Sequence, residues 1–138
     1  MSDLGGESAC WAHFLEELDT DERFDAPAGI DLDHPAAIDR SADGAVWSLP
    51  HGGDLDANLV HLTAGAVIES HVNDEVDVLI VGWDGTAVLT LDDGSTTIRR
   101  GVVTLIPRGR RRTIRAGKDG AAYLTVHRRR GPLTIGRR

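Results

Sequence analysis

Four polar side chains stand at every second position in the stretch HVNDEVD. They are His71, Asn73, Glu75 and Asp77. Side chains two residues apart share one face of a β-strand, so an unbroken strand would present an imidazole, an amide and two carboxylates together. Such groups can ligate a metal, bind a small polar molecule, or satisfy one another as a polar network. The same alternation directs Val76, Val78 and Ile80 to the opposite face, so the stretch predicts a site at the edge of an apolar core.

The composition is typical of one globular domain. The chain has 138 residues, 41% of them hydrophobic, which suffices for a single core. A lone cysteine, Cys10, excludes an intrachain disulfide and a cysteine-based metal cage. The first residues lack a signal-peptide pattern and no apolar run is long enough to span a membrane, so we expect a cytoplasmic protein without a membrane partner.

Charge is distributed unevenly along the chain. Residues 1–69 hold 15 acidic residues and 2 arginines, whereas residues 70–138 hold 7 acidic and 13 basic residues. The basic half lacks both aromatic partners and the pattern of a nucleic-acid-binding fold, so we expect no nucleic-acid partner. We interpret the two charge types as faces that lie near each other in the fold or in an oligomer.

Periodicity predicts a short helix followed by a barrel of strands. Apolar residues at helical spacing indicate an amphipathic helix over 8–18, and an irregular connector rich in acids and proline extends to residue 44. From residue 45, about eight short β-prone runs alternate with glycine, proline and aspartate turns, including a hairpin at Asp93-Gly94. They predict an all-β, antiparallel sandwich or barrel over 45–130, with residues 131–138 as a C-terminal arm.

The spacing of glycine, proline and histidine resembles the two motifs of the cupins, which are small jelly-roll barrels. The first motif would comprise Gly65, His71, Asn73, Asp77 and Gly85, and the second Gly101, Pro107, Gly109 and Arg112. The resemblance covers roughly residues 45–130 and implies a cupin-type jelly-roll barrel, also described as a double-stranded β-helix. It further implies a homodimer, because cupins commonly pair through sheet edges and open edges need a cover in any case.

The chain departs from the metal-binding pattern that the resemblance implies. Cupins with a metal use two histidines, one acid and a third histidine, whereas the positions here are His71, Asn73, Asp77 and Arg112. An asparagine oxygen is a weak ligand, and arginine cannot lose its proton to bind a cation. We therefore expect no metal cofactor, with Arg112 pairing with Asp77 or Glu75. The alternative is a divalent transition metal on His71, Asn73 and Asp77, with Glu75 or His127 as replacement ligands.

Three functions fit these residues. The first is the binding of a small polar or anionic ligand, without a tightly bound metal, by His71, Asn73, Glu75, Asp77, Arg112 and His127. His127 shares strand parity with Tyr123 and is either a pocket residue or a surface residue. The second is a cupin enzyme, such as an isomerase, epimerase or oxygenase acting on a sugar or small carboxylic acid, with His71 or a carboxylate as general base. The third is a structural polar network without a ligand. We interpret His61 as a strand residue that faces solvent or a neighbour.

Overall fold

The described part of the chain consists of strands and loops. The computed structural model describes residues 29–34, 39–50 and 53–130. The strands are β1 (Gly44–Ser48), β2 (Leu55–Leu62), β3 (Val67–Val72), β4 (Val78–Leu91), β5 (Gly94–Arg99), β6 (Val103–Ile106) and β7 (Arg111–Arg128). All seven belong to Asp31–Arg138, one of the two units into which contacts divide the chain. The all-β prediction is confirmed, whereas the predicted helix over 8–18 and arm over 131–138 lie outside the described residues.

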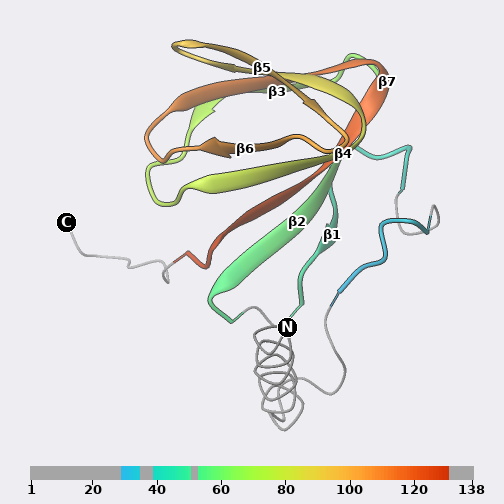
Figure 1. Cartoon of the computed structure of the whole chain (residues 1–138), viewed down its shortest axis with the longest axis horizontal. Coiled ribbons are helices and arrows are strands. Elements are labelled where there is room, and N and C mark those ends of the chain that lie inside the picture. Colours follow the sequence, from blue (N-terminus) through green and yellow to red (C-terminus); the bar gives the residue numbers. More distant parts are fainter. Residues whose placement is uncertain (1–28, 35–38, 51–52, 131–138) are drawn as a thin grey trace, which may run out of the picture. The chain divides into compact units, whose positions relative to one another are not determined.

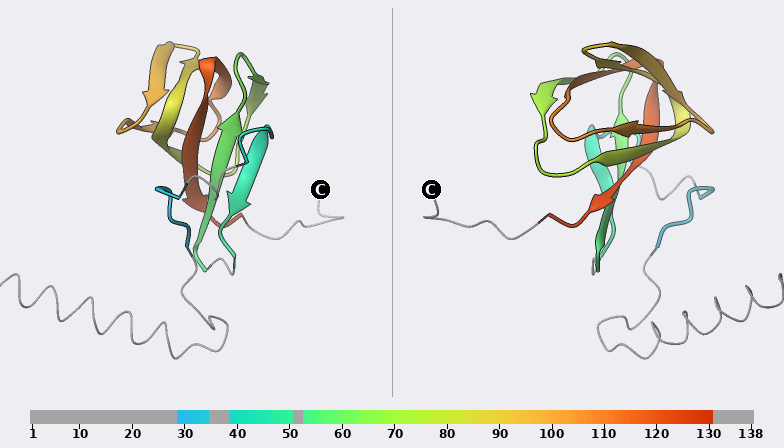
Figure 2. Two further views of the ribbon diagram at one scale, coloured as in Figure 1. Left: turned by 90° about the vertical axis from the view of Figure 1, so that its right-hand side faces the viewer. Right: turned by 60° about the vertical axis from the view of Figure 1, so that its left-hand side comes forward.

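The two longest strands, β4 and β7, each take part in two sheets. The first half of β4 pairs with β6 and with the end of β7, and its second half pairs with β5 and with the start of β7. All seven strands belong to one continuous antiparallel sheet, which β4 and β7 divide into two parts that we call sheets. One part has the order β1-β2-β7-β4-β6 and the other has the order β3-β7-β4-β5. Figures 1 and 2 show these sheets closing around a common interior. The strand pattern predicted an antiparallel sandwich or barrel, and this arrangement is the jelly roll that the resemblance to the cupins implied.

Glycines let β4 and β7 approach each other where they pass between the sheets. The pairing of these strands shifts register between Gly82 and Asp84 and again between Gly85 and Ala87. Gly85 has a φ of +62°, and a Cβ there would lie 2.1 Å from the carbonyl oxygen of Gly120. No side chain fits at that position. Because glycine is a common turn residue, the sequence pattern predicts two shorter strands in place of each of these long ones.

Alternating side chains fill the interior between the sheets. Val76, Val78 and Ile80 are buried, as the alternation predicted. They join a core whose larger members are Leu62, Leu89, Ile98, Ile106, Ile114 and Tyr123. Each such side chain contributes about 1.5–3 kcal/mol by its removal from water. Arg112 lies two residues before Ile114 on the same inward face of β7, so a charged residue borders this core.

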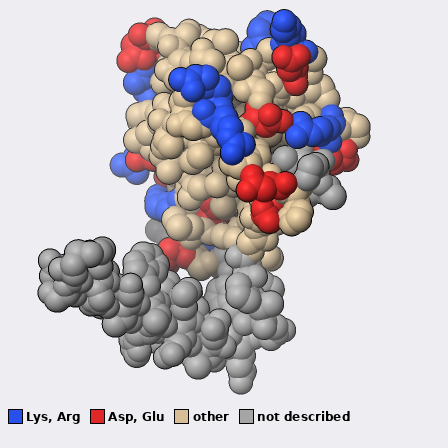
Figure 3. All heavy atoms as spheres, turned by 45° about the vertical axis from the view of Figure 1, so that its right-hand side comes forward, with Lys and Arg blue, Asp and Glu red and all other residues tan. Residues whose placement is uncertain are grey.

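The predicted hairpin forms between β4 and β5. Leu91 pairs with Gly94, so Asp92 and Asp93 make a two-residue turn, one residue earlier than the Asp93-Gly94 turn that the sequence suggested. Asp93 also accepts a hydrogen bond from Arg110 at 2.8 Å. On the face shown in Figure 3, acidic and basic side chains are interspersed in small groups with uncharged surface between them. No helix in the described residues is long and apolar enough to cross a membrane.

Candidate functional site

His71 and Arg112 stand directly opposite each other on the antiparallel strands β3 and β7. The Arg112 side chain is buried, and its Nε–H donates a hydrogen bond to His71 Nε2 at 3.1 Å. Because a guanidinium can only donate, His71 Nε2 must carry the lone pair. His71 Nδ1 lies 2.9 Å from the carbonyl oxygen of Glu69 and is therefore the protonated ring nitrogen. The imidazole is thus neutral, with both nitrogens engaged.

Asn73 follows the last residue of β3 and turns the chain into the loop of residues 73–77. Its Oδ1 accepts the backbone N–H groups of Glu75, at 2.9 Å, and Val76, at 3.3 Å. Asparagine favours such turns because its short side chain can bond to the backbone that follows it. The two bonds also fix the amide orientation, since a flipped amide would set its NH2 against two donors. Asn73 Nδ2 is buried and has no hydrogen-bond partner in the part of the chain that the structure describes.

The Pro-Arg-Gly turn between β6 and β7 is fastened to this loop by two hydrogen bonds. Gly109 donates its N–H to the Asn73 carbonyl oxygen at 2.7 Å, and Arg108 donates its N–H to Asp77 Oδ1 at 2.8 Å. Gly109 has a φ of +81°, which favours glycine at that position. The fastened turn fixes the start of β7 and thereby sets Arg112 opposite His71.

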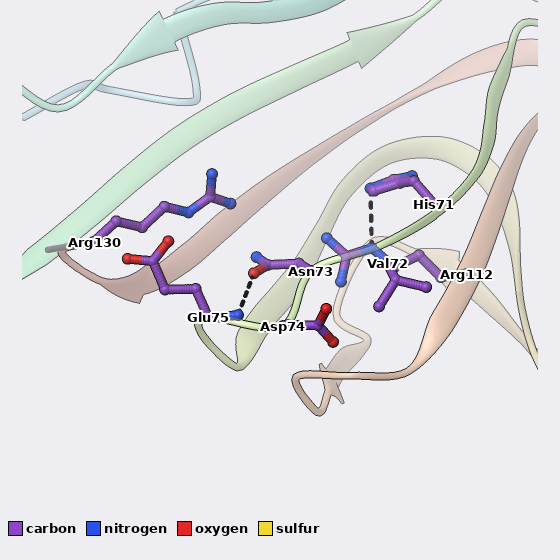
Figure 4. A pocket seen from close by; sticks show the side chains of 7 residues that line it. All are labelled: His71, Val72, Asn73, Asp74, Glu75, Arg112 and Arg130. Carbon is purple, nitrogen blue, oxygen red and sulfur yellow. Dashed lines mark hydrogen bonds between the residues drawn. The ribbon is translucent and has the colours of Figure 1, made fainter. Parts of the chain in front are cut away.

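These elements surround a cavity of about 730 Å³. Its lining consists of His71, Val72, Asn73, Asp74, Glu75, Arg112 and Arg130 (Figure 4). Figure 4 shows the Arg112 guanidinium extending toward Asn73, with Glu75 and Arg130 farther along the cavity. Arg112 Nη1 is buried and, like Asn73 Nδ2, has no hydrogen-bond partner among the described residues. Two of the residues that line the cavity therefore each have a buried N–H group without an acceptor.

The Arg112 guanidinium carries its positive charge in a buried position. Burial lowers the pKa of its guanidinium, the positive charge of Arg130 lowers it further, and Tyr123 opposes the shift. Burial in turn raises the pKa of the Tyr123 phenol. No ion pair formed within residues 29–34, 39–50 and 53–130 joins Arg112 to a carboxylate. A buried cation without an anionic partner costs free energy that a bound negative group would offset.

The structure brings together four of the six ligand-binding residues predicted from the sequence. His71, Asn73, Glu75 and Arg112 line the one cavity. Asp77 does not, because its carboxylate bonds to the Arg108 amide beside a second cavity of about 250 Å³. The predicted pairing of Arg112 with Asp77 or Glu75 is therefore wrong, and His71 is the partner of Arg112.

His127 lies apart from the other predicted residues. It shares the parity of Tyr123 on β7 but lines neither cavity, and its Nδ1 lies 2.8 Å from the Arg128 carbonyl oxygen. The sequence did not single out Asp74 or Arg130 as lining residues. Asp74 belongs to a loop, and Arg130 follows the end of β7. The alternation of side chains along a strand therefore could not predict which way either residue points.

The donor set does not fit a divalent metal. The lone pair of His71 Nε2 accepts a hydrogen bond from Arg112, and Asn73 Oδ1 accepts hydrogen bonds from two backbone N–H groups. Neither atom is therefore available to a metal. The guanidinium groups of Arg112 and Arg130 would repel a second cation in the same cavity. Protein sites for transition metals use three or four His, Cys, Asp or Glu ligands, and the described residues contain no group of three placed to hold an ion.

Comparisons with known proteins identify the fold. No protein-family model and no curated protein sequence matches the chain. Among solved structures, KdgF from Halomonas sp. matches with a TM-score of 0.56 at 19% identity, over 62% of this chain and 77% of KdgF. A cupin protein from Bacteroides fragilis matches with a TM-score of 0.51 at 21% identity, over 59% of this chain and 71% of that one. A sugar phosphate isomerase of the cupin superfamily from Silicibacter pomeroyi matches with a TM-score of 0.52 at 25% identity, over 59% of this chain and 58% of that one.

Proposed function

We propose that this chain, which has the cupin fold, binds a small anion, a carboxylate or another oxyanion, without a metal. The observation that carries this proposal is that Arg112 and Asn73, which line one cavity, each have a buried N–H donor, Nη1 and Nδ2, without a partner among the described residues. Each buried donor left without an acceptor costs about 1–3 kcal/mol. One oxyanion placed between them would accept from both, and it would also neutralise the buried guanidinium.

The neighbouring side chains support an anionic ligand with additional hydroxyl groups. A guanidinium is well suited to carboxylate and phosphate oxygens, and His71 holds Arg112 through Nε so that Nη1 remains for the ligand. Asp74 and Glu75 line the same cavity, and carboxylates accept hydrogen bonds from hydroxyls. The likeness to a sugar phosphate isomerase supports testing hydroxylated anions first.

The hydrogen bonds of Arg112 and Asn73 also favour ligand binding over the two alternatives, a purely structural polar network and an enzyme. In a purely structural network, every buried donor would have an acceptor within the protein. Here two buried donors have no acceptor among the described residues. An isomerase-type reaction needs a base, and because the lone pair of His71 Nε2 already accepts from Arg112, that role would fall to a carboxylate such as Asp74. The likeness to the isomerase keeps such a reaction as the second candidate, and the appearance of product signals on adding a sugar phosphate would support it.

The test is an NMR titration of the isotope-labelled full chain with sodium acetate, sodium gluconate and inorganic phosphate. We expect the side-chain amide signal of Asn73 to move as the Nδ2 donor gains an acceptor, with a Kd below about 1 mM for at least one of these anions. The shift reports on the buried donor itself, so nonspecific binding of anions at the exposed arginines would not reproduce it.

Two arginine variants provide the matched comparison. Arg112→Met should weaken binding at least about tenfold, because a charge-assisted hydrogen bond contributes roughly 1.5–3 kcal/mol. Arg115→Gln removes the same charge from an exposed position of the same strand and should bind like the unaltered chain. The proposal fails if none of the three anions moves the Asn73 signal, or if both variants weaken binding equally.

A further inference from the structure

Charged side chains of both signs line the cavity. Asp74 and Glu75 contribute carboxylates, and Arg112 and Arg130 contribute guanidinium groups, so the formal charges of these four side chains cancel. Arg112 is buried and forms no ion pair with a carboxylate of the described residues. The Asp74 carboxylate also has neither a hydrogen bond nor an ion pair within residues 29–34, 39–50 and 53–130. The cavity is therefore lined by a positive and a negative group that do not pair with each other.

The backbone on both sides of Asp74 is held by hydrogen bonds. The preceding carbonyl group, of Asn73, accepts from Gly109 N–H, and the following N–H group, of Glu75, donates to Asn73 Oδ1. The Asp74 carboxylate lies at the Pro-Arg-Gly turn, where a Cβ atom added at Gly109 would be 3.7 Å from its Oδ1. The Arg112 guanidinium is held separately, by the hydrogen bond from its Nε to the opposite strand. The two charges thus have different anchors, and one small ligand between them can contact both.

We propose that the ligand is a zwitterion, such as a small amino acid, whose carboxylate binds Arg112 Nη1 and Asn73 Nδ2 and whose ammonium group binds Asp74. This inference rests on the proposed function, because it assigns the carboxylate of the ligand to the same two donors. A zwitterion adds no net charge to a cavity whose own charges cancel. A simple anion would neutralise Arg112 and leave Asp74 without a positive partner.

An ammonium group suits Asp74 better than the two other groups that a small anion could carry. A hydroxyl donates a hydrogen bond to a carboxylate but leaves its charge unpaired, whereas an ammonium group donates the bond and pairs the charge. A second carboxylate could pair with Arg130, but Asp74 and Glu75 in the same cavity would repel it. The volume of about 730 Å³ leaves room for the rest of the molecule, since small-molecule sites occupy about 300–1,000 Å³.

The test is an NMR titration of the isotope-labelled full chain at neutral pH and constant ionic strength with matched pairs of compounds. The pairs are acetate and glycine, propionate and β-alanine, and butyrate and 4-aminobutyrate, which differ only by the ammonium group. We expect at least one amino acid to move the side-chain amide signal of Asn73 with a Kd about fivefold or more below that of its matched carboxylate. The expected gain is modest because Asp74 is exposed, and exposed ion pairs contribute little.

Two aspartate variants identify the carboxylate that binds the ammonium group. Asp74→Asn keeps the shape of the side chain without its charge, so it should remove the advantage of the amino acid while the matched carboxylate binds as before or more tightly. Asp92→Asn makes the same change at an exposed position in the turn between β4 and β5 that lines neither cavity, and it should keep the advantage. Thermal unfolding checks that both variants are folded.

Three results would overturn the inference. One is a set of titrations in which no amino acid binds more tightly than its matched carboxylate. Another is an advantage that Asp74→Asn and Asp92→Asn reduce equally. The third is tighter binding of succinate than of 4-aminobutyrate, because the second group of the ligand would then be an anion paired with Arg130. If a simple carboxylate still moves the Asn73 signal in these cases, the proposed function stands without the inference, and if no compound moves it, both fail.

Discussion

Two polar residues of the described chain are buried, and their surroundings differ. His61 on β2 is 5% exposed, and Arg112 on β7 is 7% exposed. The His61 imidazole bonds through Nδ1 to the Ala42 carbonyl oxygen at 2.9 Å, in the segment that precedes β1. Within the described residues, the Arg112 side chain has one hydrogen bond, to His71, and its Nη1 lacks a partner. The chain thus completes the environment of His61 and leaves that of Arg112 incomplete.

The segment of residues 39–43 is what completes the surroundings of His61. The Asp43 carboxylate accepts from Thr63 N–H at 2.6 Å and from its hydroxyl at 3.2 Å. Arg40 pairs with Asp84 of β4 at 2.8 Å. A buried polar group whose hydrogen bonds are all made within the chain stabilises one packing arrangement. A group that is held in place but has a donor without an acceptor can still form a hydrogen bond to a ligand. The partners of the two side chains thus separate a structural histidine from the arginine that we propose binds a ligand, although the two are almost equally buried.

The largest expected effect on stability falls at His61. His61→Leu keeps the side-chain volume but leaves the Ala42 carbonyl oxygen without its donor, so the free energy of unfolding should fall by about 1–3 kcal/mol. Denaturant unfolding measures the change, and the anion titration of the same variant should match that of the unaltered chain. A loss of anion binding by a folded His61→Leu variant would remove the distinction between the two regions.

Arg112→Met should have a smaller effect, of the opposite sign. Replacing a buried cation that has no anionic partner by an apolar side chain is often neutral or stabilising, so we expect the free energy of unfolding to rise by about 1 kcal/mol or to stay unchanged. An anion that binds should raise the melting temperature of the unaltered chain and not that of the variant. A destabilisation as large as that of His61→Leu would mean that Arg112 is structural.

The barrel could be predicted because its causes are local. The alternate positions of Val76, Val78 and Ile80 show which face of the segment is buried, independently of which strands lie beside it. The paths of β4 and β7 could not be predicted in the same way. Gly85 reads as a turn residue in isolation, and only its close approach to Gly120 in the folded chain shows that it lets one strand bend between sheets.

The site was predicted in part, for a related reason. Parity grouped His71, Asn73, Glu75 and Asp77 on one face, and that grouping required a continuous strand. β3 ends at Val72 because the Asn73 side chain bonds to the backbone that follows it and turns the chain. As a result, Asp74 lines the cavity although it was not predicted to, and Asp77 does not line it although it was. The resemblance placed Arg112 in one pocket with His71 and led us to expect a carboxylate partner. Its bond to His71 Nε2 follows instead from the pairing register of β3 and β7, which the sequence of one strand does not determine.

The smallest expected effect concerns the Arg40–Asp84 ion pair, which links the segment beside His61 to β4. The hydrogen bond from Arg40 holds the pKa of the Asp84 carboxyl below its usual value of 3.8, while burial opposes the shift. A lowered folded-state pKa stabilises the fold above the unfolded value, and that stabilisation is lost as the pH falls through the lowered value. Both side chains are about half exposed, so Arg40→Gln should cost less than about 1 kcal/mol at neutral pH. Thermal unfolding should show this difference shrinking below pH 3.8. A neutral-pH cost equal to that of His61→Leu would show that the segment is held by its surface charges and that the buried His61 bond contributes little.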